Sequence, residues 1–185
     1  MTRIYIITIA ALALAASQFA NAQDDIGQTE IAVGGLYKSE TTLSDNGSTV
    51  IAEDIVTLST TLSKEKEIAS QGNLSIYLEG EASALYGQAR NVIVDGVDIN
   101  QSATYRAAEA FGNVKIEQDL GDDWMAFSKA GVGVLYEELS TDGFLGEQQK
   151  FRDLSPAGQF QAGVEKKVND KLSIGVAAGT TEKFD

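Results

Sequence analysis

Residues 124–137 read Trp-Met-Ala-Phe-Ser-Lys-Ala-Gly-Val-Gly-Val-Leu-Tyr-Glu, and this stretch decides the fold. One set of alternate positions is apolar or small, comprising Trp124, Ala126, Ala130, Val132, Val134 and Tyr136. The other set includes Lys129, Gly131, Gly133 and Glu137. A period of two is typical of a β-strand, because successive side chains of a strand point to opposite faces. The stretch therefore predicts a strand with one apolar face and one polar face.

Six further segments show the same alternation, namely residues 29–38, 54–62, 74–87, 105–117, 158–168 and 172–180. The sequence holds a single proline, Pro156, and few stretches with helical periodicity. A chain built in this way is expected to form antiparallel strands. The sequence therefore predicts an all-β protein with seven visible strands.

The polar faces of these strands are charged at seven positions, namely Glu79, Glu81, Glu109, Lys115, Lys129, Glu165 and Lys167. Burying this many unpaired charges in an apolar protein core would cost too much free energy. The apolar faces carry one charge, Lys166, close to a turn. A polar inside and an apolar outside are the reverse of a soluble fold and favour a transmembrane β-barrel. The seven charges are then expected to pair in the lumen and plug it.

A soluble sheet with one solvated face would show the same alternation. Such a sheet needs a second layer to cover its apolar face, and the chain has no spare helices to supply one. The chain after residue 22 also has no run of about 18 to 20 apolar residues, so a membrane-embedded form must be a closed barrel.

The predicted connections alternate between long and short. The long ones are residues 39–53, 88–104 and 138–157, and the others are residues 63–73, 118–123 and 169–171. Outer-membrane barrels have short periplasmic turns and long outer loops. With the N-terminus in the periplasm, every long connection becomes a mobile, acidic outer loop. Asp95-Gly96 within the second of them predicts a hairpin, which would extend the neighbouring strands as a projecting ribbon.

Four aromatic residues fit this orientation. Tyr37, Tyr86 and Tyr136 lie on apolar faces at the predicted loop ends of their strands, and Trp124 lies at a turn end. Aromatic side chains of this kind mark the two membrane–water interfaces.

The first 22 residues are expected to be a cleaved secretory signal peptide. Arg3 precedes an apolar run, and Ala20 and Ala22 are the small residues that a signal peptidase reads. Cleavage would leave Gln23 as the first residue and residues 23–185 as one barrel domain. An uncleaved N-terminal anchor is the alternative.

The sequence has no His and no Cys, and its net charge is −13. The missing His removes the usual general base and metal ligand, so we expect neither an enzyme nor a cofactor or metal protein. The charge argues against nucleic-acid binding. The spacing of Asp95, Asp98 and Asn100 does not match a calcium loop.

The chain resembles the small outer-membrane β-barrel family that includes the OmpA-type transmembrane domain and porin-family surface proteins. The resemblance is carried by the signal peptide, by residues 130–134, and by the hairpin of residues 162–165 and 172–175 around the turn at 168–171. It implies an eight-stranded up-and-down barrel in the outer membrane of a Gram-negative bacterium. It also implies contact with outer-membrane lipid and lipopolysaccharide, and insertion by the barrel-assembly machinery.

Seven visible strands and the ending Lys183-Phe184-Asp185 depart from that family. A missing last strand, a count wrong by one and an unusual closure are all open explanations. Arg90, Lys150 and Arg152 are cations of the predicted outer loops, either solvated or in contact with lipopolysaccharide phosphates. The expected function is that of a structural or surface-exposed barrel. The alternatives are a narrow porin for ions or small solutes, and a soluble periplasmic β-domain that binds an apolar ligand.

Overall fold

The computed structural model describes residues 28–45, 47–99, 101–142, 148–169 and 172–184, and the predicted signal peptide lies outside them. The described chain is all-β and antiparallel. Its strands are β1 (Gln28–Asp45), β2 (Ser48–Gln71), β3 (Leu74–Ala89), β4 (Asn91–Val94), β5 (Val97–Asp98), β6 (Ala103–Gly121), β7 (Trp124–Asp142), β8 (Gln148–Asn169) and β9 (Leu172–Lys183). The seven long strands correspond to the seven that the alternation predicts, and β4 and β5 form an additional short hairpin.

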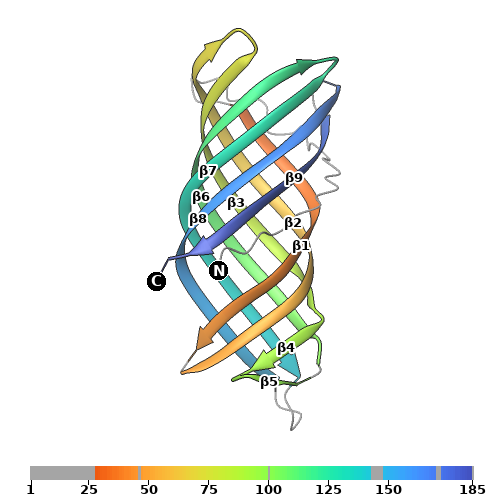
Figure 1. Cartoon of the computed structure of the whole chain (residues 1–185), viewed down its shortest axis with the longest axis vertical. Coiled ribbons are helices and arrows are strands. Elements are labelled where there is room, and N and C mark those ends of the chain that lie inside the picture. The colour runs from red at the N-terminus through yellow and green to blue at the C-terminus, as the bar shows by residue number, and fades with distance from the viewer. Residues whose placement is uncertain (1–27, 46, 100, 143–147, 170–171, 185) are drawn as a thin grey trace.

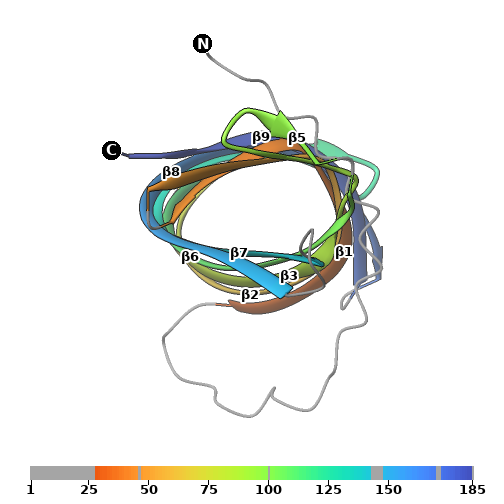
Figure 2. The ribbon, with the colours of Figure 1, turned by 90° about the horizontal axis from the view of Figure 1, so that it is seen from below.

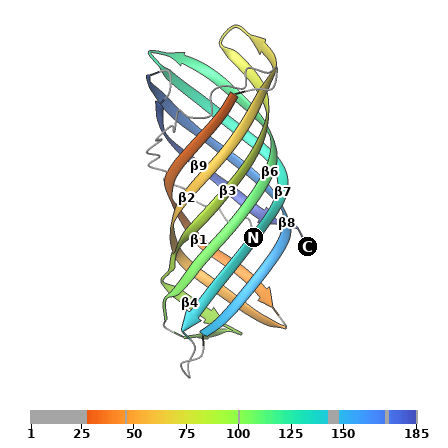
Figure 3. The ribbon, with the colours of Figure 1, turned by 180° about the vertical axis from the view of Figure 1, so that it is seen from behind.

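Each long strand pairs with its neighbours in the chain, so the sheet runs β1-β2-β3-β6-β7-β8-β9. The strands are tilted against the long axis of the molecule (Figures 1 and 3). Seen along that axis, the sheet curves round a central space (Figure 2). β1 and β9 are its two edges, and β1 also contacts β8 across the seam. The curvature gives the sheet an inner and an outer face.

The predicted long connections are mostly strand rather than loop, which corrects the expectation of mobile outer loops. Residues 39–45 belong to β1 and residues 48–53 to β2, and residues 138–142 and 148–157 extend β7 and β8. The segment 63–73 is likewise mostly part of β2. Residues 39–45, 48–53 and 138–142 pair because their inward side chains have a core to pack into: Leu43, Val50 and Leu139 are fully buried.

The hairpin predicted at Asp95-Gly96 is confirmed, since both residues have positive φ and join β4 to β5. The predicted ribbon is wrong in its pairing. β4 pairs with β2, with Val50 opposite Val94. It therefore occupies, at this end of β2, the neighbouring place in the sheet that β3 occupies along the rest of β2. We call this end of the molecule, at the bottom of Figure 1, the β4–β5 end.

At the β4–β5 end the inside of the curved sheet is an apolar core. Its largest fully buried apolar side chains are Leu43, Val50, Ile55, Val92, Tyr105 and Leu139. These come from β1, β2, β4, β6 and β7, so they close the central space from several sides. Many outward residues of the same segments are polar, for example the exposed Thr42 and Ser44, while the outward Ile51 and Ile93 lie side by side and are half-buried. Here the sheet has the polarity of a soluble protein.

Over the remaining length the polarity is reversed. Leu58, Val132 and Leu154 point outward and are 71%, 65% and 69% exposed. We call this outer surface the apolar band, which comprises the outward side chains of residues 31–37, 56–62, 74–86, 108–120, 124–136, 154–164 and 174–178. The predicted apolar faces therefore point outward. Within the described ranges, no helix is long and apolar enough to span a membrane.

On β1 and β2 the reversal coincides with an irregularity in the strands. Lys38 lies opposite Ile55 and Glu40 opposite Glu53 in one unbroken register, but the pair between them is missing, and Asp54 at that point has a φ of 53°. A residue in this conformation breaks the regular pleat and changes which side chains face inward. Val50 and Ala52 are therefore buried on one side of Asp54 and Ile55 and Thr57 on the other, a pattern that unbroken alternation would not give.

Two glycines on the inner face of β7 let β6 approach closely. A Cβ atom added to Gly133 would lie 2.0 Å from the carbonyl oxygen of Ala110, and one on Gly131 would lie 2.3 Å from that of Gly112. Both contacts are with backbone, which cannot move aside. The glycines of the Gly131-Val132-Gly133 pattern thus leave room on the inner face of β7 for the backbone of β6 to approach.

Candidate functional site

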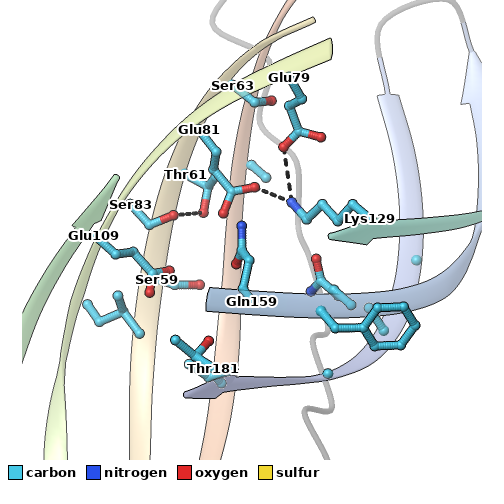
Figure 4. Close-up of a pocket in the computed structure, with 18 of the residues that line it drawn as sticks. Ser59, Thr61, Ser63, Glu79, Glu81, Ser83, Glu109, Lys129, Gln159 and Thr181 are labelled. Atoms are coloured by element: carbon cyan, nitrogen blue, oxygen red, sulfur yellow. Dashed lines mark hydrogen bonds and ion pairs between the residues drawn. The ribbon is translucent and has the colours of Figure 1, made fainter. Parts of the chain in front are cut away.

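A cavity of about 230 Å³ lies on the inner face and is lined by residues of all seven long strands. Figure 4 shows part of it, with labelled side chains from β2, β3, β6, β7, β8 and β9 converging. Its polar lining includes Glu30, Lys38, Ser59, Thr61, Ser63, Glu79, Glu81, Ser83, Tyr105, Glu109, Lys115, Lys129, Gln159, Gln161, Glu165, Ser173, Thr180 and Thr181. The inside of the apolar band therefore carries many polar and charged groups, beside apolar side chains such as Leu36, Leu85 and Leu135.

Lys129 of β7 extends into this space. Its Nζ lies 3.1 Å from Glu79 Oε1 and forms a second ion pair with Glu81, both on β3 (Figure 4). Asn113 Nδ2 donates to Glu79 at 3.4 Å, and Gln159 Nε2 donates to Asn113 Oδ1 at 2.8 Å. These contacts join β3, β6, β7 and β8, so they reach beyond neighbouring strands of one wall.

Lys115 of β6 forms a second cluster. Its Nζ lies 3.0 Å from Glu65 Oε2 on β2 and 2.6 Å from Glu117 Oε1. The ammonium group also lies 5.8 Å from the centre of the Phe127 ring. All three charged side chains are at most 11% exposed, so each carboxylate offsets part of the cost of burying the lysine.

Glu137 of β7 holds a third cluster, between the cavity and the apolar core. Its fully buried carboxylate forms ion pairs with Lys38 at 2.7 Å and with Lys183 at 2.5 Å. It also accepts hydrogen bonds from the Tyr105 hydroxyl at 2.6 Å and the Thr41 hydroxyl at 2.8 Å. The cluster therefore joins β1, β6, β7 and β9, which includes both edges of the sheet.

Lys38 and Lys183 keep the Glu137 carboxyl ionised. Burial alone raises the pKa of the Glu137 carboxyl, but Lys38 and Lys183 outweigh burial and hold that pKa at about 2. Burial and the negative Glu137 raise the pKa of the Tyr105 hydroxyl well above its ordinary value. Tyr105 therefore stays a hydrogen-bond donor, and Glu137 stays an anion.

Lys183 also closes the seam between the two edge strands. Its ammonium group lies 2.6 Å from Asp153 Oδ2 on β8 and donates to the carbonyl oxygen of Thr42 on β1 at 2.8 Å. Among the described residues no backbone ladder pairs β1 with β9. In the described part of the seam, side chains thus make a connection that backbone pairing does not.

The predicted lumen network is only partly the one that the structure shows. Glu79, Glu81 and Lys129 are brought together, and Glu109 and Glu165 line the same cavity. Lys115 pairs with two glutamates that the prediction left out. Lys167 is exposed and lies outside the cavity, because it stands next to the β8–β9 turn, where the inner face opens to solvent.

Several residues of these clusters were not predicted as site residues, because their sequence context says little about which side chains they would meet. Glu65 lies in a segment predicted as a connection, and Lys183 lies beyond the last predicted strand. Lys38 and Glu137 fall on the predicted polar faces, but nothing in the alternation indicates that strands so far apart in the chain meet. Their pairing depends on the curvature of the sheet.

The four predicted interfacial aromatics all lie on the outer face, and Tyr37, Tyr86 and Trp124 are 39%, 59% and 40% exposed. Tyr86 lies three residues before the end of β3, as predicted, but Tyr37 and Tyr136 do not stand at strand ends, which corrects the prediction for them, because β1 and β7 continue toward the β4–β5 end. Trp124 is the first residue of β7, as predicted, and Lys166 lies 5.4 Å from its ring.

The chemistry available at this site is ion pairing and hydrogen bonding. The described part of the chain contains no group of three or more His, Cys, Asp or Glu side chains placed to hold a metal ion. Asp95 forms a hairpin turn, where its carboxylate accepts a hydrogen bond from the Thr49 amide, and Asn100 lies outside the described residues. Comparison of this chain with family models, curated proteins and solved structures finds no match.

Proposed function

We propose that this protein is an outer-membrane β-barrel of a Gram-negative bacterium, with a structural or surface role, a closed lumen and no catalytic activity. The observation that carries the proposal is the reversal of polarity along the same strands. On β7, Val132 and Val134 are exposed on the outer face, whereas Leu135 and Leu139 are buried on the inner face. Two exposed valines are ordinary in a soluble protein, but an exposed apolar face on every long strand is not.

The apolar band has the height that a bilayer requires. It runs over residues 74–86 of β3, 108–120 of β6 and 124–136 of β7. A tilted strand needs roughly 9–11 residues to cross the hydrocarbon core. Exposed apolar area of this extent on a soluble monomer is rare outside interaction surfaces. Lipid is the partner that fits an apolar surface on every long strand.

Beyond the band, the strands continue into a part with soluble polarity. The apolar core around Leu43, Val92 and Leu139 lies inside, and exposed polar side chains lie outside. This supports an arrangement in which the β4–β5 end stands in water. Paired strands would then be what the described residues present at that surface.

The proposed lumen is closed at two levels. The ion pairs of Lys129 occupy the cavity, and the apolar core closes the β4–β5 end. A dry core of this kind leaves no path for hydrated ions, which argues against the porin alternative. The charged lining of the cavity argues against the soluble protein that binds an apolar ligand, because an apolar ligand would strip water from those charges.

The test is reconstitution of the purified protein into vesicles and into a planar bilayer. We expect the folded protein to float with the vesicles and to migrate differently on a gel before and after heating. In the planar bilayer we expect no steady conductance, either from the unmodified protein or from Lys129→Ala, because the apolar core remains in place. Steady channels from the unmodified protein would favour the porin. A protein that stays in solution without a gel shift would favour the soluble domain.

A further inference from the structure

A basic cluster lies on the outer face, at the edge of the apolar band nearest the β4–β5 end. Arg106 of β6, Glu138 of β7 and Arg152 of β8 stand directly opposite one another in the sheet register. Arg106 Nη1 lies 3.6 Å from Glu138 Oε1, and Arg152 Nε donates to Glu138 Oε2 at 2.9 Å. Both arginine side chains are 57% exposed, so two guanidinium groups face outward around one carboxylate.

The cluster is positive although the chain as a whole carries a charge of −13. Lys150, opposite Ser140 on β7, adds a third exposed cation next to Arg152. The hydrogen bond from Arg152 lowers the pKa of the Glu138 carboxyl, and Lys150 and Arg106 lower it further. Glu138 therefore stays ionised and orients the guanidinium groups, and both arginine side chains remain more than half exposed beside it.

Apolar and aromatic side chains adjoin the cluster on the side of the band. Two residues further along the strands, Ala108 faces Tyr136 and Tyr136 faces Leu154, which is 69% exposed. The Arg106 guanidinium lies 5.7 Å from the centre of the Tyr86 ring. Cations that directly follow an apolar surface and rest on an aromatic ring occupy the level at which lipid headgroups meet acyl chains.

We propose that Arg106, Arg152 and Lys150 form a binding site for the phosphate of an anionic membrane lipid. The proposal rests on the proposed membrane insertion and names the lipid chemistry that this surface recognises. The phosphate would lie between the two guanidinium groups, whose planar N–H forks match phosphate oxygens. The acyl chains would follow Val134 and Leu154 along the band. The opposite edge of the apolar band carries two lysines, Lys64 and Lys66, whose ammonium groups lack the planar pair of N–H donors of a guanidinium group.

The test is native mass spectrometry of the detergent-solubilised protein after incubation with phosphatidic acid or with phosphatidylcholine of the same acyl chains. We expect the unmodified protein to retain phosphatidic acid preferentially. The double variant Arg106→Ala/Arg152→Ala is expected to lower that retention at least about tenfold, the effect of losing about 1.4 kcal/mol of binding free energy. The matched control Lys64→Ala/Lys66→Ala removes the same charge at the other edge of the band and is expected to leave retention nearly unchanged.

Equal losses in the two double variants would overturn the site and indicate general charge attraction. Inorganic phosphate that binds as well as phosphatidic acid would overturn the assignment to a lipid. Each variant is first checked for the gel shift of the folded protein, and Arg106→Lys/Arg152→Lys, which keeps the charge, is expected to retain an intermediate amount. If the unmodified protein neither shifts nor floats with vesicles, the proposed function fails. If it does both but shows no lipid preference, only the lipid site fails.

Discussion

Replacing Glu137 with alanine is expected to lower the free energy of unfolding by about 3–5 kcal/mol, the usual effect of removing one partner from a buried ion pair. The Glu137 carboxylate is fully buried and binds Lys38, Lys183 and Tyr105. Its loss leaves two largely buried ammonium groups without this anion. It also removes one of the links between the edge strands β1 and β9, so the destabilisation should be greatest at the seam of the sheet. Urea unfolding, followed by the gel shift, measures the effect.

Glu182→Ala is the matched control, because Glu182 is an exposed carboxylate on β9, next to Lys183. A surface change of this kind is expected to alter stability by no more than about 0.5 kcal/mol. Equal effects of the two substitutions would contradict the buried cluster. Glu137→Gln should lie between them, because the amide keeps the shape of the side chain and its acceptor but loses the charge.

The same carboxyl gives stability a dependence on acidic pH. The pKa of Glu137 is about 2 in the folded protein, against an ordinary value of 4.5. A lowered pKa means that the contribution is complete above about pH 4.5 and is lost as the pH falls toward 2. Between these limits the unmodified protein should lose more stability than Glu137→Gln. Parallel pH curves for the two proteins would contradict this assignment.

Val132→Arg is expected to destabilise the protein in vesicles by about 2–4 kcal/mol, as for a cation placed on the lipid face near the bilayer midplane. Val132 is outward, 65% exposed and well inside the apolar band on β7. In water an exposed valine tolerates arginine within about 0.5 kcal/mol. The size of the effect therefore reports which solvent surrounds this surface. The measurement is again urea unfolding of the vesicle-bound protein.

Ser44→Arg is the control for this substitution. Ser44 is exposed on β1, beyond the apolar band at the β4–β5 end, where the proposal places water. Its replacement is expected to be nearly neutral. Equal effects of Val132→Arg and Ser44→Arg would mean that lipid does not distinguish the two surfaces, and the apolar band would then need another partner.

The alternation of residues 124–137 predicted the direction of each side chain on β7, because a period of two is a local property of the chain. The lengths of the strands were predicted less well. Residues 39–53 looked like a loop because their polar residues break the band pattern, yet Leu43 and Val50 point into a core that forms only when β1, β2, β4 and β7 meet. That core is a product of the tertiary fold and has no local signature.

For the candidate site too, local alternation predicted the directions of the side chains but not their tertiary contacts. Glu79, Glu81 and Lys129 were predicted to share the lumen, since all lie on polar faces of predicted strands. The choice of partners was not predictable. Lys115 pairs with Glu65 because β2 and β6 flank β3 in a curved sheet, and Lys183 reaches Glu137 because the edges of the sheet approach each other. Both pairs depend on curvature, which alternation does not encode.

Depth-dependent fluorescence quenching tests the lipid-facing surface most directly. The sequence has one tryptophan, so Trp124→Phe/Val132→Trp places a single probe within the apolar band, and Trp124→Phe/Ser44→Trp places one beyond it. The proteins are reconstituted in vesicles whose lipids carry bromine at different depths of the acyl chain. We predict that the probe at position 132 is quenched most strongly by bromine deep in the chain and that the probe at position 44 is hardly quenched. A probe at position 132 that no brominated lipid quenches would contradict the insertion of the apolar band into lipid.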